Sequence, residues 1–389
     1  MRKKWINGTI VSFSIMALLS ACGDSERGES NTSANADSSS EQNEEGNDTE
    51  VELEGYSEVA EIPVDGNVSD PVFYISGNGD KLLWAEQPGQ FAHIEGSKIW
   101  IDGEIKEADI PERDPAIQPM LSESGKIVYS HSDFDKPVEE RYWVSEQDPS
   151  TGEETDTYMD NDWDQYVVTM GSNYSEDPRR VIGVLDHYDE EVVHMYIWDM
   201  DSNDIKEIDL TETVSNEVEL EELTLYPHGA ITSDGTQLYA VLADVGILRY
   251  NLEDETSEFI YSADIGFFAN NEKSQTTILT SDDRYILYAI LDDDRNMTHF
   301  AYEIESGESI ELGEGIATYP LADGTVMMFN TNNEFIHFDL DTETSTVAHT
   351  PELDEDDRID SFTVSKDGTT LAYAVRDHDE TVIRLMKNE

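Results

Sequence analysis

One short pattern recurs along most of this chain, and its clearest copy runs from Ser365 to Val375. This copy reads Ser-Lys-Asp-Gly-Thr-Thr-Leu-Ala-Tyr-Ala-Val. Asp can hydrogen-bond to its own backbone and Gly accepts a positive φ, so the Ser-x-Asp-Gly part predicts a tight turn. The apolar residues that alternate after the turn predict a half-buried strand. The pattern therefore predicts a turn that leads directly into a β-strand.

Repetition of this pattern predicts the architecture of the chain. Further copies begin at Ser76, Ser122, Ser175, Ser233, Ser281 and Ala322. Downstream of most copies, two strand-like runs flank an acidic turn such as Asp199–Asp204, so each unit has one strand before the first turn, one after it and two around the acidic turn. Seven such units between residues 51 and 389 have ~48 residues each, which is typical of propeller blades. The sequence predicts an all-β, seven-bladed β-propeller of four-stranded blades.

The two ends of the repeat region indicate how the ring closes. The last unit has candidate strands near Asp360–Val364, Leu371–Val375 and Val382–Met386, and the chain stops at Glu389 before a fourth strand. An alternating segment, Val59–Val64, precedes the first full unit. We expect this N-terminal segment to supply the missing outer strand, because a closed ring leaves fewer exposed sheet edges.

Residues 1–21 have the features of a secretory signal peptide. Basic residues at positions 2 to 4 precede an apolar stretch from Ile10 to Leu19, which is too short and too interrupted to span a bilayer. The quartet Leu19-Ser20-Ala21-Cys22 that follows resembles the lipobox of bacterial lipoproteins. This resemblance implies cleavage before Cys22 and lipidation of its sulfur with diacylglycerol, with palmitate among the acyl groups. Cys22 is the only cysteine, so intramolecular disulfides and cysteine-based metal sites are excluded.

Residues 22–50 contain Ser, Asn, Glu, Asp and Gly with almost no apolar side chain. Such a segment cannot bury a core, so we expect a disordered acidic tether of roughly 30 Å or more between the lipid and the folded domain of residues 51–389. Together, the leader and the tether place the domain on the extracytoplasmic face of the cell membrane.

The charge of the chain limits its partners. The full sequence has 87 acidic and 23 basic residues, and loss of the leader with its three basic residues leaves 20, for a net charge of −67. Such a surface repels nucleic acid and anionic lipid headgroups, and its self-repulsion opposes folding unless salt screens it. We therefore expect no nucleic-acid partner and a source that lives at high salt or alkaline pH, a haloalkaliphile.

The Ser-x-Asp-Gly-x-x-Leu-Ala-Tyr run, followed by a strand and an acidic turn, resembles the WD-like repeat of TolB-type β-propellers. The resemblance covers most of residues 70–389, is strongest at Ser365 and Ser233, and is weak at Ser175, where Asp177-Pro178 replaces Asp-Gly. It implies a fold and no particular activity, because these propellers serve as scaffolds, as gating domains and as lyases.

Loops between the second and third strands of several units are rich in Asp and His. In a closed ring these loops share one rim, where oxygen and imidazole ligands from different blades could hold Ca²⁺ or another divalent cation. The alternative is that so acidic a chain places Asp in every loop. The candidate metal ligands are Asp133, Asp186, His187, Asp292, Asp377 and His378.

The sequence contains no Gly-x-Ser-x-Gly elbow, no phosphate-binding glycine loop and no His-Glu-x-x-His motif, so it predicts no catalytic and no cofactor-binding residue. The leading interpretation is a membrane-anchored lipoprotein whose propeller is a non-enzymatic binding or scaffold module for an envelope protein or wall component. The alternative is an extracytoplasmic metal-dependent propeller enzyme of the lyase or lactonase type.

Overall fold

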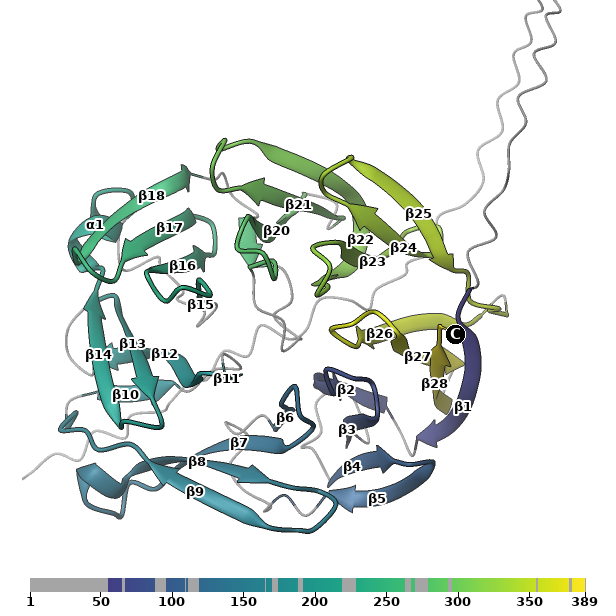
Figure 1. Cartoon of the computed structure of the whole chain (residues 1–389), viewed down its shortest axis with the longest axis horizontal. Helices are drawn as coiled ribbons and strands as arrows, with labels where there is room; N and C mark the ends of the chain where they lie inside the picture. The colour runs from purple at the N-terminus through teal and green to yellow at the C-terminus, as the bar shows by residue number, and fades with distance from the viewer. Residues whose placement is uncertain are drawn as a thin grey trace, which may run out of the picture. The chain divides into compact units, whose positions relative to one another are not determined.

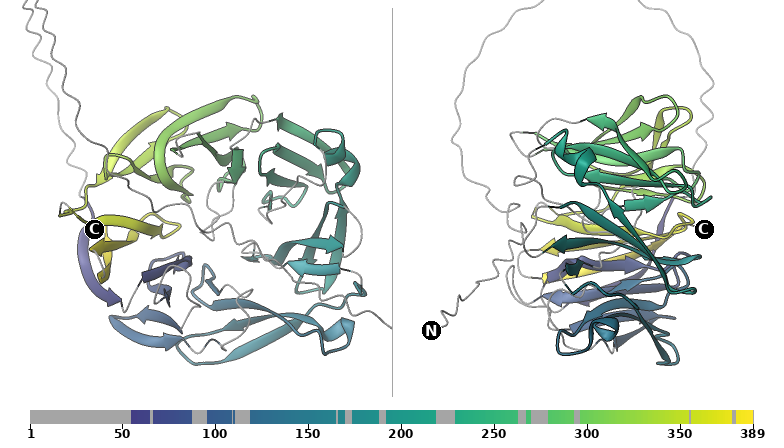
Figure 2. Two further views of the ribbon diagram at one scale, coloured as in Figure 1. Left: turned by 180° about the vertical axis from the view of Figure 1, so that it is seen from behind. Right: turned by 90° about the vertical axis from the view of Figure 1, so that its left-hand side faces the viewer.

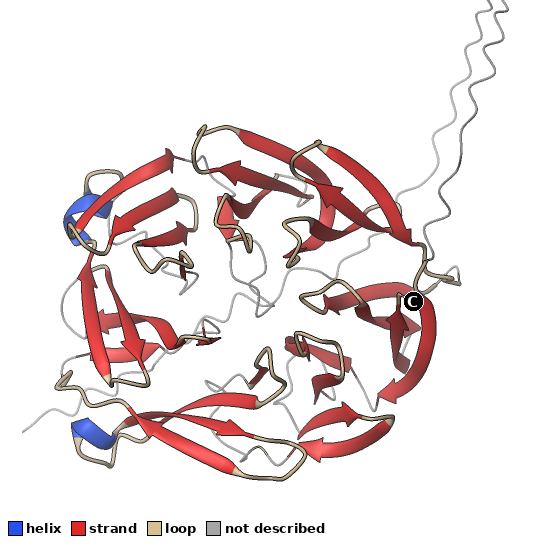
Figure 3. Ribbon diagram, viewed as in Figure 1, coloured by secondary structure: helices blue, strands red, loops and turns tan. Residues whose placement is uncertain are grey.

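The computed structural model describes residues 55–64, 67–87, 96–108, 110, 119–164, 166–169, 174–187, 192–218, 229–262, 267–269, 279–292, 296–354, 356–377 and 380–388, all within one compact unit. Strands dominate these residues (Figure 3), beside a short 3₁₀ helix η1 (Val138–Glu140) and a one-turn helix α1 (Thr211–Ser215). The sheets are arranged in a circle around a common centre (Figures 1 and 2). The predicted all-β propeller is therefore confirmed.

Four of the sheets have four strands each. The first contains β2 (Asn67–Ile75), β3 (Lys81–Gln87), β4 (Gly96–Ile101) and β5 (Glu104–Ala108). The second contains β6 (Met120–Leu121), β7 (Ile127–Ser132), β8 (Tyr142–Gln147) and β9 (Glu154–Tyr158). The third contains β15 (Gly229–Ile231), β16 (Gln237–Leu242), β17 (Gly246–Asn251) and β18 (Thr256–Ser262). The fourth contains β1 (Ser57–Val64), β26 (Arg358–Val364), β27 (Thr370–Asp377) and β28 (Glu380–Lys387).

The other two sheets are larger. One has five strands: β10 (Tyr166–Thr169), β11 (Tyr174–Glu176), β12 (Arg179–His187), β13 (His194–Asp199) and β14 (Asp204–Asp209). The other has seven: β19 (Phe267–Ala269), β20 (Tyr285–Leu291), β21 (Met297–Glu303), β22 (Ser309–Pro320), β23 (Val326–Asn330), β24 (Phe335–Asp339) and β25 (Thr344–His349).

The predicted number of seven four-stranded blades is wrong, because the described strands form six sheets. The difference arises at β22, where the sequence predicted one unit to end and the next to begin. One strand instead pairs with β21 through Ser309 to Glu314 and with β23 through Gly315 to Pro320. Two glycines permit this path: Gly313 has φ +111°, and a Cβ on Gly315 would lie 2.4 Å from the Phe329 carbonyl oxygen.

The spare N-terminal segment Val59–Val64 lies within β1, at the outer edge of the sheet that also contains the last three strands of the chain. β1 pairs antiparallel with β28, and Ile62 lies opposite Ile383. Both side chains are buried against Trp84 and Ala374 in an apolar cluster that joins this sheet to the one after it. The two ends of the domain therefore meet in a single sheet.

The turn at Ser365 shows why the repeated sequence folds as predicted. The Asp367 carboxylate accepts hydrogen bonds from the Ser365 hydroxyl at 2.6 Å and from the Thr369 amide at 2.9 Å, while the Ser365 hydroxyl oxygen accepts the Thr370 amide at 2.9 Å. Gly368 has φ +72°, a conformation that side chains with a Cβ disfavour. The Ser365 and Asp367 side chains are thus both paired within the turn.

These turns also connect neighbouring sheets near the centre of the ring. The Gly77 amide donates to the Glu123 carbonyl at 3.0 Å, and the Ala322 amide donates to the Lys366 carbonyl at 2.7 Å. The Ser233 amide donates to the Asp283 carboxylate at 2.8 Å. Backbone and side-chain bonds between successive turns therefore hold the inner strands in place, in addition to the apolar clusters between the sheets.

A polar network joins the second sheet of the ring to the five-stranded sheet. Glu146 in β8 has a side chain that is 4% exposed, and it forms an ion pair with Arg179 of β12. It also accepts a hydrogen bond from the Tyr174 hydroxyl at 2.8 Å, and Lys126 Nζ lies 3.7 Å away. Arg179 reaches Asp201 at 2.7 Å with its other terminal nitrogen. A buried carboxylate is thereby paired by groups that come from the adjacent sheet.

Candidate functional site

The predicted metal ligands lie at equivalent places in the ring. Asp133 follows β7, Asp186 and His187 end β12, Asp292 follows β20 and Asp377 ends β27. Each of these strands is the second or equivalent strand of its repeat, so these strand ends lie on the same side of the ring. His378 lies outside the described residues.

The local contacts of these residues are those of turn and strand ends. The Asp133 carboxylate accepts the Asp135 amide at 3.0 Å. The Asp292 carboxylate accepts the Asn296 amide at 2.8 Å and its side-chain amide at 3.0 Å. Partial burial raises the pKa of Asp186, and the His187 ring packs edge-to-face against Tyr166 at 5.1 Å. Among the residues that the structure describes, no three His, Cys, Asp or Glu side chains gather as metal ligands. The shared cation site stays a prediction.

Ser145, His131 and Asp156 lie together like the members of a catalytic triad, but their hydrogen bonds run in the opposite direction from those of a triad. Ser145 Oγ lies 2.9 Å from His131 Nε2 and donates to the Asp156 carboxylate at 2.6 Å. Because the only hydroxyl proton of Ser145 goes to Asp156, His131 can only donate to this oxygen. A nucleophilic serine needs the opposite arrangement, in which the imidazole accepts the proton. Ser145 is also fully buried. This cluster is structural.

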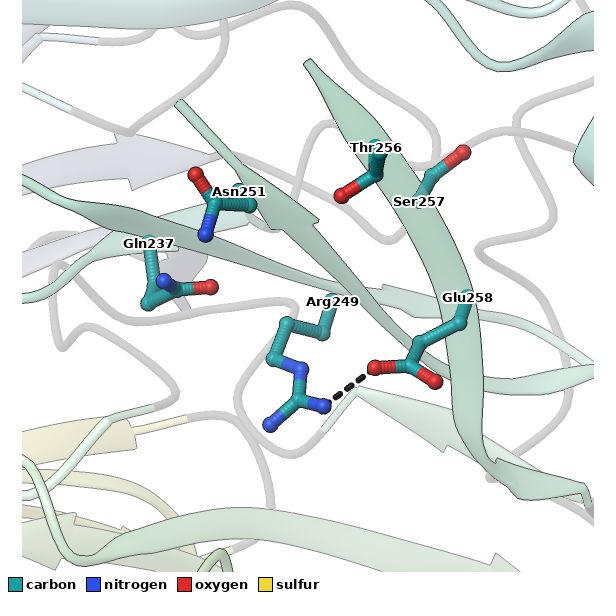
Figure 4. A pocket seen from close by; sticks show the side chains of 6 residues that line it. All are labelled: Gln237, Arg249, Asn251, Thr256, Ser257 and Glu258. Carbon is teal, nitrogen blue, oxygen red and sulfur yellow. Dashed lines mark hydrogen bonds and ion pairs between the residues drawn. The ribbon is translucent and has the colours of Figure 1, made fainter. Parts of the chain in front are cut away.

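A polar crevice of about 420 Å³ lies on one face of the sheet β15–β18 (Figure 4). Strand register builds it: Gln237, Asn251 and Thr256 are direct cross-strand neighbours, and Arg249 lies opposite Glu258 in the next row. Because side chains alternate between the two faces of a sheet, these five residues point the same way. Ser257 completes the lining. Three strands thus place amide, hydroxyl, guanidinium and carboxylate groups around one space.

The electrostatics of this crevice differ from those of the rest of the chain. Arg249 donates to the Glu258 carboxylate, and this hydrogen bond raises the pKa of Arg249 above its usual value. The other side chains that line the crevice are uncharged, so the charges of Arg249 and Glu258 cancel and the crevice has no net charge. The groups can donate and accept hydrogen bonds without a net charge. Chemically, the crevice suits a small neutral polar molecule or a polar side chain.

No single stretch of the sequence indicates this crevice. Its lining comes from three short alternations, at residues 237–239, 249–251 and 256–258, that are separated by turns. The alternation was visible in each strand, but only the pairing register shows that the polar positions face one another. A search for polar residues at matched positions of the three predicted strands would have found it.

Comparisons with known proteins give a fold and no activity. No family model matches the chain, and no curated protein matches it. A solved oligogalacturonate lyase in complex with manganese superposes with a TM-score of 0.53 at 11% sequence identity, over 86% of this chain and 98% of that one. TolB from Acinetobacter baumannii gives a TM-score of 0.40 at 14% identity, over 82% of this chain and 80% of that one. At 11% identity the match to the lyase is a likeness of fold alone, and it agrees with the ring of sheets that forms the β-propeller.

Proposed function

We propose that this protein is a lipoprotein anchored through Cys22 to the extracytoplasmic face of the cell membrane, and that its propeller is a non-enzymatic binding or scaffold module. The observation that carries the anchoring is the order of segments in residues 1–22: basic residues, an apolar stretch, and then Leu19-Ser20-Ala21-Cys22. The whole stretch lies outside the described residues. Within the part of the chain that is described, no helix has the length and apolar character needed to cross a bilayer.

Replacing Cys22 by serine should abolish lipid attachment, because the hydroxyl is not the thioether-forming group that the lipobox presents. We expect the wild-type chain to incorporate an alkyne-tagged palmitate in cells and to fractionate with membranes, and the Cys22→Ser variant to lose both properties. Ser20→Ala is the matched control, since it keeps a small residue two positions before the cysteine. Labelling of Cys22→Ser at the wild-type level would disprove the anchor.

The described surface supports a binding role toward cationic groups. Of the sixteen lysines and arginines in the described residues, thirteen form ion pairs with carboxylates of the same chain. The paired cations therefore leave a large excess of unpaired carboxylates. Such a surface attracts cationic segments and counterions and raises their rate of encounter. We infer an envelope protein or wall component with exposed positive charge as the partner. Cross-linking in intact envelopes, followed by mass spectrometry, identifies it; recovery of anionic partners alone would contradict this inference.

Salt should stabilise the fold strongly, because 87 carboxylate side chains repel one another at low ionic strength. We expect the midpoint of thermal unfolding to rise as NaCl increases from about 0.05 M to molar concentrations, where the Debye length falls from over 10 Å to about 3 Å. Sodium sulfate and sodium chloride compared at equal ionic strength separate charge screening from the general effect of salt on burial. A midpoint that does not change with NaCl would contradict the expectation.

A further inference from the structure

The outer strands of the sheets differ sharply in charge. In this ring the outer edges are formed by β1, β5, β9, β14, β18 and β25 (Figure 1). Natural sheets protect such edges from pairing with other chains mainly by charged residues or proline. Five of these strands contain at least one Asp or Glu: β1 reads SEVAEIPV, β5 EIKEA, β9 ETDTY, β14 DIKEID and β18 TSEFIYS. The sixth, β25, reads TSTVAH and contains no Asp, Glu, Lys, Arg or Pro.

The edge of β25 is also accessible. It pairs on one side with β24, from Phe335↔His349 to Asp339↔Thr344, and it ends the seven-stranded sheet. All residues from Thr344 to Val347 are exposed, and Val347 is 48% exposed. At the other end, a Cβ on Gly55 would lie 3.8 Å from the Ala348 carbonyl oxygen, so the chain itself approaches the edge there. Among the described residues, no strand pairs with the outer edge of β25 from Thr344 to Val347.

We propose that two copies of this protein associate through antiparallel pairing of β25 with β25 of the second copy. A copy of the chain fits this edge better than a charged partner, because Thr and Val are the residue types that pair well across antiparallel strands and neither strand brings a charge to the contact. Antiparallel pairing also keeps the acidic turns of the two copies, Asp341–Glu343, at opposite ends of the contact. Parallel pairing would bring the two acidic turns together.

The high negative charge of each copy predicts that this association depends on salt. Two copies with a net charge near −67 each repel one another at low ionic strength. At molar salt this repulsion is screened beyond about 3 Å, while backbone hydrogen bonds at the strand edge remain. The contact is small, since pairing of one short strand buries less than the ~1,200 Å² at the lower end of stable interfaces, so the dimer is weak and in exchange with the monomer. If the proposed lipid on Cys22 anchors both copies, confinement to the membrane raises their effective concentration.

Sedimentation velocity tests the proposal on the chain of residues 22–389 with Cys22→Ser, which has neither the apolar leader nor the lipid. We expect a monomer at low salt and a growing dimer fraction as NaCl rises. Val347→Glu should raise the dimer dissociation constant at least tenfold, because it places like charges at the paired edges. Ile105→Glu is the matched control: Ile105 is 47% exposed on the outer strand β5, and its substitution adds the same charge elsewhere.

Hydrogen exchange then locates the contact. Amides between Thr344 and Val347 should exchange more slowly as the dimer fraction increases, and those of β5 should not change. A chain that stays monomeric at every salt concentration would overturn the proposal. So would a dimer that Val347→Glu and Ile105→Glu weaken equally, or one whose protected amides lie elsewhere.

Discussion

Replacing Arg179 by methionine should destabilise the propeller by about 3 kcal/mol, because it leaves a buried carboxylate without its main partner. Glu146 is 4% exposed and is paired by Arg179, while Lys126 Nζ remains only at 3.7 Å. Burial lowers the pKa of Arg179, but its hydrogen bonds to Glu146 and Asp201 outweigh this effect and raise it overall. Methionine keeps the apolar stem of the side chain, so the decrease in the free energy of unfolding measures the effect of removing the charged guanidinium group. Urea unfolding at one fixed NaCl concentration measures it.

Two further variants make this result specific. Arg284→Met removes an arginine that lies just before the equivalent strand and reaches Asp341 at 2.6 Å. Its side chain is 45% exposed, so its loss should destabilise the fold much less than the loss of Arg179. The double variant Arg179→Met, Glu146→Leu should recover most of the lost free energy of unfolding, since two apolar side chains leave no buried charge without a partner. If Arg179→Met and Arg284→Met cost the same, or the double variant is the least stable, the network does not act as described.

Acidification should weaken the fold through one buried histidine. His299 in β21 is 0% exposed, and neither ring nitrogen makes a hydrogen bond of regular geometry. Burial lowers its pKa from about 6.5 to about 4, with the Gly315 backbone opposing the shift. The unfolded chain therefore binds a proton between about pH 6.5 and 4 that the folded chain does not bind. The free energy of unfolding that comes from keeping this ring neutral is fully present above pH 6.5. It is lost as the pH falls from about 6.5 to about 4, and the loss amounts to up to about 3 kcal/mol.

The comparison of variants isolates this contribution from that of the many carboxylates. His299→Leu replaces this buried ring by an apolar side chain that does not titrate, so the loss of stability between pH 7 and pH 4.5 should be smaller than in the wild type by ~2 kcal/mol. His337→Leu is the control: this ring is half-buried and its Nε2 lies 3.1 Å from Thr325 Oγ1. This variant measures what the loss of an imidazole elsewhere in the fold does to the pH dependence. Parallel curves for the wild type and His299→Leu would exclude His299 as the source.

Much of the fold could be predicted because its signals are local. The turn at Ser365 is encoded by Ser, Asp and Gly within four residues, and the structure satisfies each of those groups inside the same turn. Alternating apolar residues such as Leu371, Tyr373 and Val375 predicted a strand, and all three are buried in β27. Both signals depend on interactions between residues close in sequence, so they hold whatever the rest of the chain does.

The blade count failed because it assigned a separate four-stranded sheet to each of the seven copies of the repeated turn. At Gly313 and Gly315 the backbone bends without breaking its pairing, and β22 continues from one predicted unit into the next. Nothing local distinguishes a glycine that ends a strand from one that bends it. Whether the strand ends or bends depends on the neighbouring strands β21 and β23, which supply hydrogen-bonding partners on its two sides.

For the candidate sites, too, the sequence predicted where residues lie along the strands but not which side chains come together. The sequence placed Asp133, Asp186, His187, Asp292 and Asp377 at the ends of equivalent strands, and the structure has them there. It could not say which polar side chains converge, because the crevice at Arg249 and Glu258 requires the register between β17 and β18. It also could not identify the burial of His299, whose neighbours in the sequence, Thr298 and Phe300, are only half-buried.

By itself, then, the sequence determined the repeated turn, the strands, their β-propeller arrangement and the charge of the surface, since these follow from local hydrogen bonding, alternation and composition. The tertiary structure decided the number of sheets, the pairing of Arg179 with Glu146, the isolation of His299 and the uncharged outer edge at β25. Each of these depends on which strands lie side by side. Which strands pair depends on packing between residues far apart in the chain, and no local sequence pattern predicts it.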